Sequence, residues 1–425
     1  MKDSQVSQKS IYFWNLLGNL AAAGVSVLYL MIVSRLTDAF IADKFSLSYS
    51  IGNLWVIIGL FQVRNYQGTD VKNQHTLTSY FLARFLTTVI MLLTALPYFL
   101  FLGYSFSEYS VLLVALFLLG YRVCDAWSDL FQGQCQKNER LDIAGKLMTG
   151  RYTISVFVLC FILILTKNLV FATSGLFLFN LFFILLGDYA KVRKFERIDW
   201  ANLFNRDNIQ DSVQILKVCF PLFSSGFLIN LIFNEPKQAI EVGLSKGILE
   251  QGMQRDYNIL FMPAFFMSLC ILVIRPLMTD LASLWHNRNM DKFHKVHRKI
   301  YIYLVIAGII AVILAYFMGI PILSFVFGVN LQGQELVLTI LLLSGVCYSL
   351  ALVIENIVTI FRYQKYLLIV YVLVYLFSKI VTLNWILDNG LLGASLSFLC
   401  SMFLYLLGNG LVYLFIKNKL LLRSE

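Results

Sequence analysis

Three charged side chains lie close together in the fourth long apolar stretch of the sequence. Arg122, Asp125 and Asp129 are spaced at offsets of 0, 3 and 7, which places them on one face of an α-helix. Charge inside hydrocarbon is costly and marks function by default. The spacing predicts an ion network that either lines a water-filled route, with one carboxylate exchanging a proton, or fixes this helix against its neighbours.

Three further arginines, Arg64, Arg84 and Arg151, lie at the inner ends of predicted spans. A lone arginine in such a place commonly anchors the helix end by reaching the membrane surface. Together they could form a cationic rim at the inner mouth of a cavity, because guanidinium groups bind phosphate oxygens in pairs. Arg64 is the strongest candidate, since the polar residues 65–67 beside it offer further donors.

Charged residues also occur along the second half of the chain. Lys237 and Arg255 lie near the predicted outer side with Glu235 close in sequence, and they are either cargo-binding cations or part of a solvated loop. Glu355, at the end of a predicted span, is an ion-coupling candidate, as are Asp125, Asp129 and Glu235.

Two cations lie deep inside predicted spans. Arg275 adjoins Pro276, which bends a helix and frees a carbonyl one turn earlier, and this arrangement could present the arginine to a cavity. Lys379 lies well inside the eleventh predicted span. It either faces a cavity or reaches outward to the membrane surface.

Other motifs indicate no metal, cofactor or nucleotide site. His286, His294 and His297 fall in one connection, but the basic residues that flank them favour a surface helix over a cation site. The chain contains no phosphate-binding loop of the Gly-x-x-x-x-Gly-Lys-Ser/Thr type. Its seven cysteines are scattered, so we expect no disulfide frame and no resident cofactor, although coupling to a proton gradient, a sodium gradient or the membrane potential stays open.

The composition predicts an all-α polytopic membrane protein. The 425 residues are 59% hydrophobic and only 14% charged, with a mean hydropathy of +0.75, whereas a soluble domain is about 25% charged. Apolar stretches of about 20 residues cross the bilayer as helices. We predict twelve spans, at roughly 11–33, 45–63, 80–102, 110–131, 152–167, 169–188, 213–233, 257–278, 299–318, 335–355, 364–386 and 391–416.

The basic residues predict the orientation. With a cytoplasmic N-terminus, the inner side carries 25 Lys and Arg and the outer side 7, with Lys379 counted on the outer side, while Arg122 and Arg275 inside spans complete the 34. This asymmetry follows the positive-inside rule and places both termini in the cytoplasm. The net charge of +10 therefore reflects topology and contact with anionic membrane lipids, and we expect no nucleic-acid partner.

The span count divides the chain into two halves. We predict a six-helix lobe at 1–190, a basic cytoplasmic linker at 191–212 and a second six-helix lobe at 213–425. Halves with an even number of spans enter from the same side and form parallel repeats around a central cavity. Four of the six prolines, Pro221, Pro236, Pro263 and Pro276, fall in the helical pair formed by spans seven and eight, with Pro236 just past the end of span seven. We predict this pair to be the hinge.

The sequence resembles the polysaccharide transporter branch of the multidrug/oligosaccharidyl-lipid/polysaccharide exporter superfamily, the O-antigen-flippase-like proteins. The resemblance runs over essentially the whole chain. Its most recognisable pieces are Val63-Arg64-Asn65-Tyr66-Gln67, the segment DLFQGQCQKNERLDIAG over 129–145, Arg151, Pro221, Asn234–Ile240 (NEPKQAI), Pro263 and Pro276-Leu277.

This resemblance implies a flippase of a bacterial cytoplasmic membrane. The cargo would be an oligosaccharide repeat unit on a polyprenyl pyrophosphate, moved to the outer leaflet by alternating access for O-antigen or capsule synthesis. Polysaccharide polymerase machinery is an expected partner. An antiporter of drugs or other small molecules with the same fold is the alternative, and a membrane enzyme is disfavoured because no connection exceeds about 25 residues and the longest outer one lacks histidine.

Overall fold

The computed structural model confirms an all-α membrane protein. It describes residues 7–68, 70, 74–101, 104, 109–264, 267, 281, 284–285, 287, 289–361 and 363–421. Over these residues every regular element is a helix, and ten helices are long and apolar enough to cross a membrane. The predicted eighth span, 257–278, lies partly outside the described residues.

The chain forms two compact units, Met1–Phe227 and Leu228–Glu425. The division falls inside helix α9 (Arg206–Ser245), which runs without a break. The lobes predicted at 1–190 and 213–425, with a linker at 191–212, would divide the chain earlier. They stay a prediction about the arrangement in the membrane.

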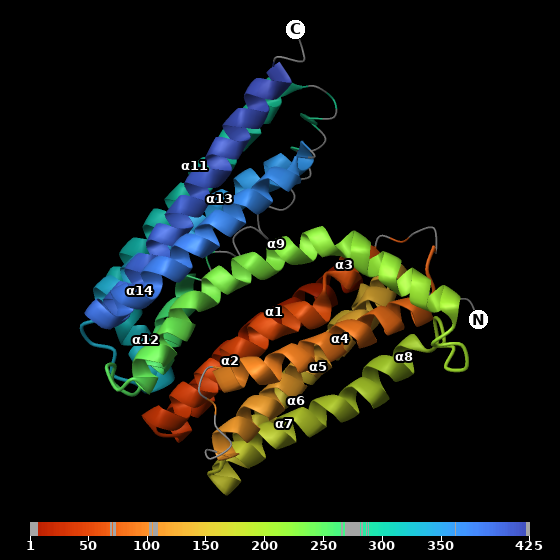
Figure 1. Cartoon of the computed structure of the whole chain (residues 1–425), viewed down its shortest axis with the longest axis horizontal. Helices are drawn as coiled ribbons and strands as arrows, with labels where there is room; N and C mark the ends of the chain where they lie inside the picture. The colour runs from red at the N-terminus through yellow and green to blue at the C-terminus, as the bar shows by residue number, and fades with distance from the viewer. Residues whose placement is uncertain are drawn as a thin grey trace. The chain divides into compact units, whose positions relative to one another are not determined.

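Unit 1 is a bundle in which α1 packs along α6, α2 along α5, and α7 against α5 and α6. Figure 1 draws these helices from red through yellow. Two clusters of buried apolar side chains form the core. The helices are α1 (Gln8–Leu36), α2 (Ala39–Leu60), α3 (Val63–Gln67), α4 (Leu77–Phe101), α5 (Tyr109–Lys137), α6 (Leu141–Thr166), α7 (Leu169–Phe183), the π-helix η2 (Ile184–Tyr189), α8 (Ala190–Val192) and the first part of α9.

Glycine allows α1 and α6 to approach closely. A Cβ on Gly145 would lie 2.1 Å from the Trp14 carbonyl oxygen, and a Cβ on Gly18 would lie 2.9 Å from the Gly145 oxygen. Small residues permit such contacts between membrane helices, where packing rather than water exclusion drives association. This backbone contact fixes the position of the helix that carries Arg151.

The tight turn predicted between the fifth and sixth spans is confirmed. Helix α6 ends at Thr166, and Lys167 takes a left-handed conformation with φ of 50°. The side chain of Asn168 then accepts a hydrogen bond from the backbone N–H of Val170, which caps α7. Two residues therefore suffice to reverse the chain.

Unit 2 contains the rest of α9, a helical stretch over 253–264 and a group of long helices in which α13 packs against α11 and α14. Figure 1 draws α11, α13 and α14 from cyan to blue. Its remaining elements are α11 (Met290–Leu314), the π-helix η3 (Ala315–Gly319), α12 (Ile320–Phe327), α13 (Glu335–Ile360), the 3₁₀ turn η4 (Gln364–Tyr366) and α14 (Leu367–Leu421).

Helix α14 contains the last two predicted spans. Gly390 interrupts it with φ of 57° and ψ of −131°, a conformation that residues with a Cβ rarely adopt. The interruption lies between the spans predicted at 364–386 and 391–416, so their boundary is confirmed.

Several helices extend beyond their predicted spans, and two of these extensions carry candidate site residues. Span seven was expected to end at residue 233, but α9 continues to Ser245 with Pro236 inside it. Span five was expected to begin at residue 152, but α6 begins at Leu141 and Arg151 lies well inside the helix. In both places polar side chains continue a helix beyond its apolar part, because partners inside the unit satisfy them.

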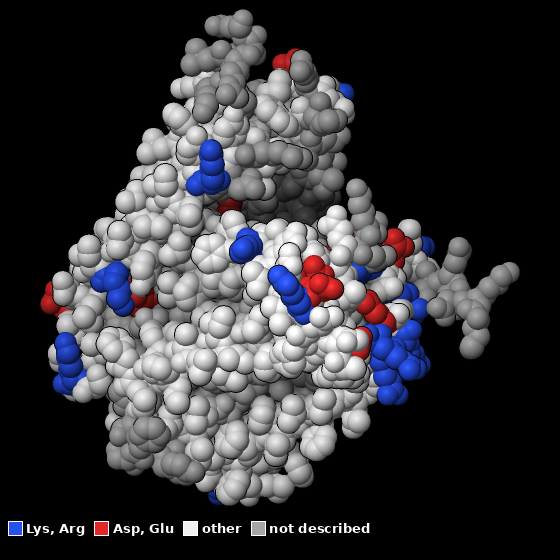
Figure 2. All heavy atoms as spheres, turned by 45° about the vertical axis from the view of Figure 1, so that its right-hand side comes forward, with Lys and Arg blue, Asp and Glu red and all other residues white. Residues whose placement is uncertain are grey.

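The surface has wide uncharged areas. Large apolar side chains are exposed along the long helices, for example Leu93, Phe157 and Phe325. Figure 2 shows broad stretches without Lys, Arg, Asp or Glu; the largest group of basic side chains lies at the right of the face drawn, and other Lys and Arg side chains are scattered over it. This distribution suits helices that face lipid.

Candidate functional site

Asp125 joins two buried arginines within unit 1. Its Oδ2 lies 2.6 Å from Nη1 of Arg122, one turn earlier on α5, and its Oδ1 lies 2.7 Å from Nη2 of Arg151 on α6. The hydroxyl of Tyr152 donates to the same Oδ1 at 3.2 Å. The predicted pairing of Arg122 with Asp125 is present, and Arg151 is a member of the network rather than a surface anchor.

Aromatic rings surround these two guanidinium groups. Arg122 lies over the rings of Tyr49 and Tyr121, at 4.5 and 5.0 Å from their centroids, and Arg151 lies 4.5 Å from the Tyr152 ring centroid. Ring faces attract cations, most strongly where water is excluded. The stacking therefore helps to offset the cost of burying two arginines that share the Asp125 carboxylate.

Asp129 belongs to a second network. Arg84 on α4 donates from Nη2 to its Oδ2 at 2.8 Å, and Arg64 on α3 lies 3.4 Å from its Oδ1. Arg64 also donates to the side-chain oxygens of Gln132 at 2.6 Å and Gln136 at 3.3 Å. Although Asp129 shares one helix with Arg122 and Asp125, as the spacing indicated, its cations come from other helices.

The two arginines of this network differ in exposure. The side chain of Arg84 is 0% exposed, whereas that of Arg64 is 24% exposed. Arg84 also donates to the carbonyl oxygen of Gly59 near the end of α2, which Thr87 reaches at 2.8 Å. Arg84 therefore acts inside the bundle, and Arg64 is the more accessible of the two cations.

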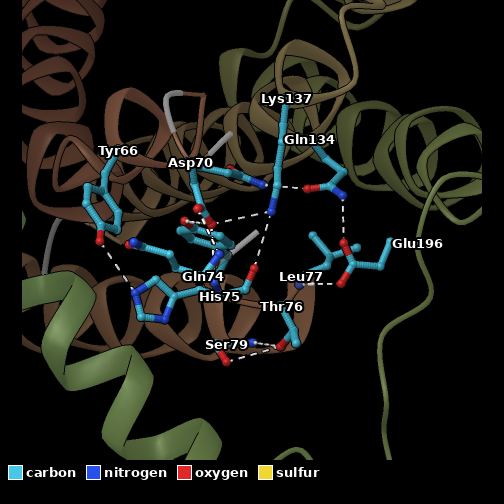
Figure 3. A network of polar contacts seen from close by, with 12 residues as sticks. Tyr66, Asp70, Gln74, His75, Thr76, Leu77, Ser79, Gln134, Lys137 and Glu196 are labelled. Carbon is cyan, nitrogen blue, oxygen red and sulfur yellow. Dashed lines mark hydrogen bonds and ion pairs between the residues drawn. The ribbon is translucent and has the colours of Figure 1, made fainter. Parts of the chain in front are cut away.

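A third network, which sequence reasoning missed, surrounds Asp70 between α3 and α4. Asp70 accepts hydrogen bonds from the backbone N–H groups of Gln74 and His75, at 2.9 and 3.2 Å, and from the Tyr80 hydroxyl at 3.0 Å. The ammonium group of Lys137 lies 3.4 Å away. Figure 3 shows Gln74, His75 and Lys137 around the Asp70 carboxylate.

These contacts lower the pKa of Asp70. Burial alone would raise its pKa, but the two backbone N–H groups, the Tyr80 hydroxyl and the charge of Lys137 together outweigh burial. Hydrogen bonds and a nearby cation favour the ionised form of a carboxyl group. Asp70 therefore fixes the start of α4 as a carboxylate.

The segment between α8 and α9 is fastened to the same helix start. Glu196 accepts from the backbone N–H of Leu77 at 2.7 Å and from the Gln134 amide at 2.8 Å, as Figure 3 shows. The hydroxyl of Ser79 donates to Asn208 on α9 at 3.0 Å. The predicted basic linker is thus attached to unit 1 along much of its length.

In unit 2 the predicted charged residues each contact another residue of the same unit. Lys379 on α14 donates to both oxygens of Glu235 on α9, at 3.0 and 3.1 Å. Glu355 on α13 accepts from the Tyr405 hydroxyl at 2.7 Å. Lys237 lies over the Phe261 ring at 5.0 Å, and Arg255 pairs with Asp256 at 2.8 Å.

For the predicted hinge prolines and Arg275, the structure gives at most a position within a helix. Pro221 and Pro236 lie within the continuous helix α9, and Pro263 lies in the helical stretch 253–264. Arg275 and Pro276 lie outside the described residues. Within the part of the chain that the structure describes, no group of three or more His, Cys, Asp or Glu side chains is suited to hold a metal ion.

Sequence reasoning also missed Asp188 on the π-helix η2. Asp188 is buried and interacts electrostatically with Arg151. A π-helix in an apolar span is rare and often marks a functional position, but no local pattern in the sequence announces it. Lys137 and Glu196 were missed because their partners lie more than 60 residues away in the sequence.

Comparisons with known proteins identify the fold. No model of a known protein family matches the chain, and no curated protein sequence does. An inward-facing multidrug resistance MATE family transporter of the MOP superfamily matches it with a TM-score of 0.70 and 13% identity, over 97% of this chain and 96% of the other. This chain has the MATE transporter fold.

Two more solved structures extend the likeness. An outward-facing multidrug resistance MATE transporter matches with a TM-score of 0.61 and 15% identity, over 98% of this chain and 97% of the other. A MOP superfamily transporter from Pyrococcus furiosus, described by the reverse polarity of its binding pocket, matches with a TM-score of 0.59 and 13% identity, over 95% and 94%. The MATE fold therefore covers essentially the whole chain.

Proposed function

We propose that this chain is a membrane transporter that works by alternating access. The observation that carries the proposal is its full-length likeness to MATE structures solved in both inward-facing and outward-facing conformations. A fold seen in two such states supports a protein that opens to one side of the membrane at a time. We place it in a bacterial cytoplasmic membrane with both termini inside.

The charges of this chain favour an anionic cargo. In the network around Asp129, two arginines share one carboxylate. The network therefore carries a net charge of +1. Arg64 is the partly exposed member, and its guanidinium fork suits phosphate oxygens. A polyprenyl-pyrophosphate-linked oligosaccharide fits this chemistry, because its pyrophosphate cannot cross hydrocarbon without such partners.

A second candidate is an antiporter of drugs or other small molecules. The matched structures that state a cargo are multidrug resistance transporters, so the comparisons support this candidate more directly than the flippase. The Pyrococcus furiosus transporter, with its reversed pocket polarity, indicates that one fold serves pockets of either sign. The charge pattern and the comparisons thus favour different cargoes.

Coupling is also a proposal. Asp125, Asp129, Glu235 and Glu355 are the acids considered for proton or sodium coupling, and each has a hydrogen-bonding or cationic partner. For the lipid-linked cargo, the membrane potential is an alternative driving force, because moving one charge through 100 mV is worth about 2.3 kcal/mol.

An experiment in cells that lack the native gene and express the Arg64→Gln variant distinguishes the two candidate cargoes. We expect loss of surface polysaccharide with unchanged insertion in the membrane, while the exposed control Arg193→Gln exports normally. Normal export by Arg64→Gln would remove this residue from the mechanism. Drug susceptibility that changes with Arg64→Gln, while export stays normal, would support the antiporter.

A further inference from the structure

Helix α2 ends in an unusual backbone conformation. Phe61 and Gln62 both take left-handed angles, with φ of 44° and 57°. A residue with a Cβ disfavours this region, and two such residues in succession are rare. Since neither is glycine, contacts around the break must hold it open.

The contact that holds Phe61 comes from α9. The Phe61 ring stacks on Phe223 with centroids 4.2 Å apart and planes 15° apart, and it also approaches Phe220 at 6.4 Å. On the other side, the carbonyl of Gly59 accepts hydrogen bonds from Arg84 and Thr87. The break therefore has one support on α9 and one on α4.

The break determines where Arg64 points. Arg64 follows Gln62 by two residues, and the Gln62 side-chain oxygen accepts from Asn65 at 2.7 Å. If residues 61 and 62 took right-handed helical angles, α2 would continue into α3 as one helix. Arg64 would then turn away from Asp129 and Gln132, which it contacts only because the chain changes direction at the break.

We propose that Phe61 and Phe223 are positioning residues that place Arg64 for the cargo, with the ring stack deciding between a broken and a continuous α2–α3 helix. The proposal deepens the proposed function and rests on it. Loss of the stack lets the strained residues relax to helical angles, and the guanidinium of Arg64 leaves its present partners. Presentation of the cation thus depends on the position of α9.

Helix α9 is suited to transmit this dependence. Pro221, which lies between Phe220 and Phe223, lacks the N–H that would bond to the carbonyl one turn earlier, and this weakens the helix locally. The helix then continues through residue 227, where the chain divides into its two units. A bend of α9 near Pro221 would move the Phe223 ring that supports the break.

Hydrogen–deuterium exchange of the purified full chain in lipid nanodiscs tests the proposal without any cargo. In Phe223→Ala, we expect the amides of residues 62–64 to exchange more slowly than in the wild type, because a continuous helix would bond them. Unchanged exchange, or faster exchange along the end of α2, would overturn the proposal.

A matched pair of second substitutions isolates the strain. Gln62→Gly and Gln62→Ala both remove the amide that binds Asn65, but only glycine removes the penalty for a left-handed residue. In the Phe223→Ala background, the ratio of broken to continuous helix should be roughly ten-fold higher with glycine at position 62 than with alanine. We also expect Phe223→Ala to reduce export and the glycine substitution to recover part of that loss. Equal effects of the two substitutions would contradict the proposal.

The two proposals can fail separately. If the exchange pattern follows the expectation but Arg64→Gln exports normally, the ring stack does control the break between α2 and α3, and Arg64 does not bind the cargo. If Arg64→Gln abolishes export but Phe223→Ala leaves both exchange and export unchanged, the cargo assignment stands and the positioning role is wrong.

Discussion

Lys379 binds both carboxylate oxygens of Glu235, at 3.0 and 3.1 Å, although 144 residues of sequence separate them. The Glu235 side chain is 5% exposed and that of Lys379 is 54% exposed. A lysine that reaches in from α14 therefore neutralises a buried acid on α9. The sequence analysis assigned the two residues to different tasks, cargo binding and ion coupling, whereas the structure pairs them with each other.

The first prediction concerns this pair. Lys379→Gln should lower the free energy of unfolding by about 1–3 kcal/mol, because it leaves the buried Glu235 carboxylate without its cation. The double variant Glu235→Gln with Lys379→Gln should recover much of the loss. Thermal unfolding in detergent measures both, and a double variant less stable than either single one would show that the pair does not act as a unit.

The second prediction concerns Asp129. Asp129→Asn should destabilise the protein by about 3–5 kcal/mol, because it leaves the fully buried Arg84 without its carboxylate. Arg64→Gln should cost much less, since its side chain is partly exposed and Arg84 still pairs with Asp129. Unfolding temperatures of the two variants provide the comparison, and equal losses would mean that the difference in burial has no energetic weight.

The third prediction is a pH dependence at Asp70. Its folded-state pKa lies below the ordinary 3.8, so the folded protein binds this proton less readily than the unfolded chain does. The stabilisation is full above about pH 4 and is lost as the pH falls through the folded-state pKa. Asp70→Asn should therefore cost about 1–3 kcal/mol at neutral pH, with a penalty that shrinks on acidification below pH 4. Melting temperatures of the wild type and Asp70→Asn from pH 3 to pH 8 measure this penalty. A loss of stability in Asp70→Asn that grows as the pH falls would contradict the prediction.

The fourth prediction uses the contact between α1 and α6. Gly145→Ala places a Cβ 2.1 Å from the Trp14 carbonyl oxygen, and because the neighbour is backbone the helices must separate. Overpacking of this kind costs about 1–3 kcal/mol. Gly24→Ala on α1 is the matched control, since a Cβ there meets nothing within 4 Å. Thermal unfolding should separate the variants, and equal stability would show that the helices move apart at no cost.

The helical membrane fold was predictable because it rests on local properties. Long apolar stretches must satisfy their backbone groups internally and therefore form helices in lipid. Two boundaries were also predictable from local sequence, because each depends on a few adjacent residues: the turn at Lys167 and Asn168, and the interruption at Gly390. The helix ends at Leu141 and Ser245 were not, because polar side chains extend both helices where partners from elsewhere in the fold satisfy them.

The candidate site was predictable only as a set of residue types. Arg122 and Asp125 form a pair that their spacing on one helix indicates. By itself, then, the sequence determined that this chain is a helical membrane protein with costly charges in its apolar part. Only the tertiary structure decided which charges meet: Asp129 with Arg84 and Arg64, and Glu235 with Lys379. The reason is that a buried ion takes whatever partner the packing of distant helices brings within about 4 Å, and helix packing depends on side-chain shape across the whole bundle.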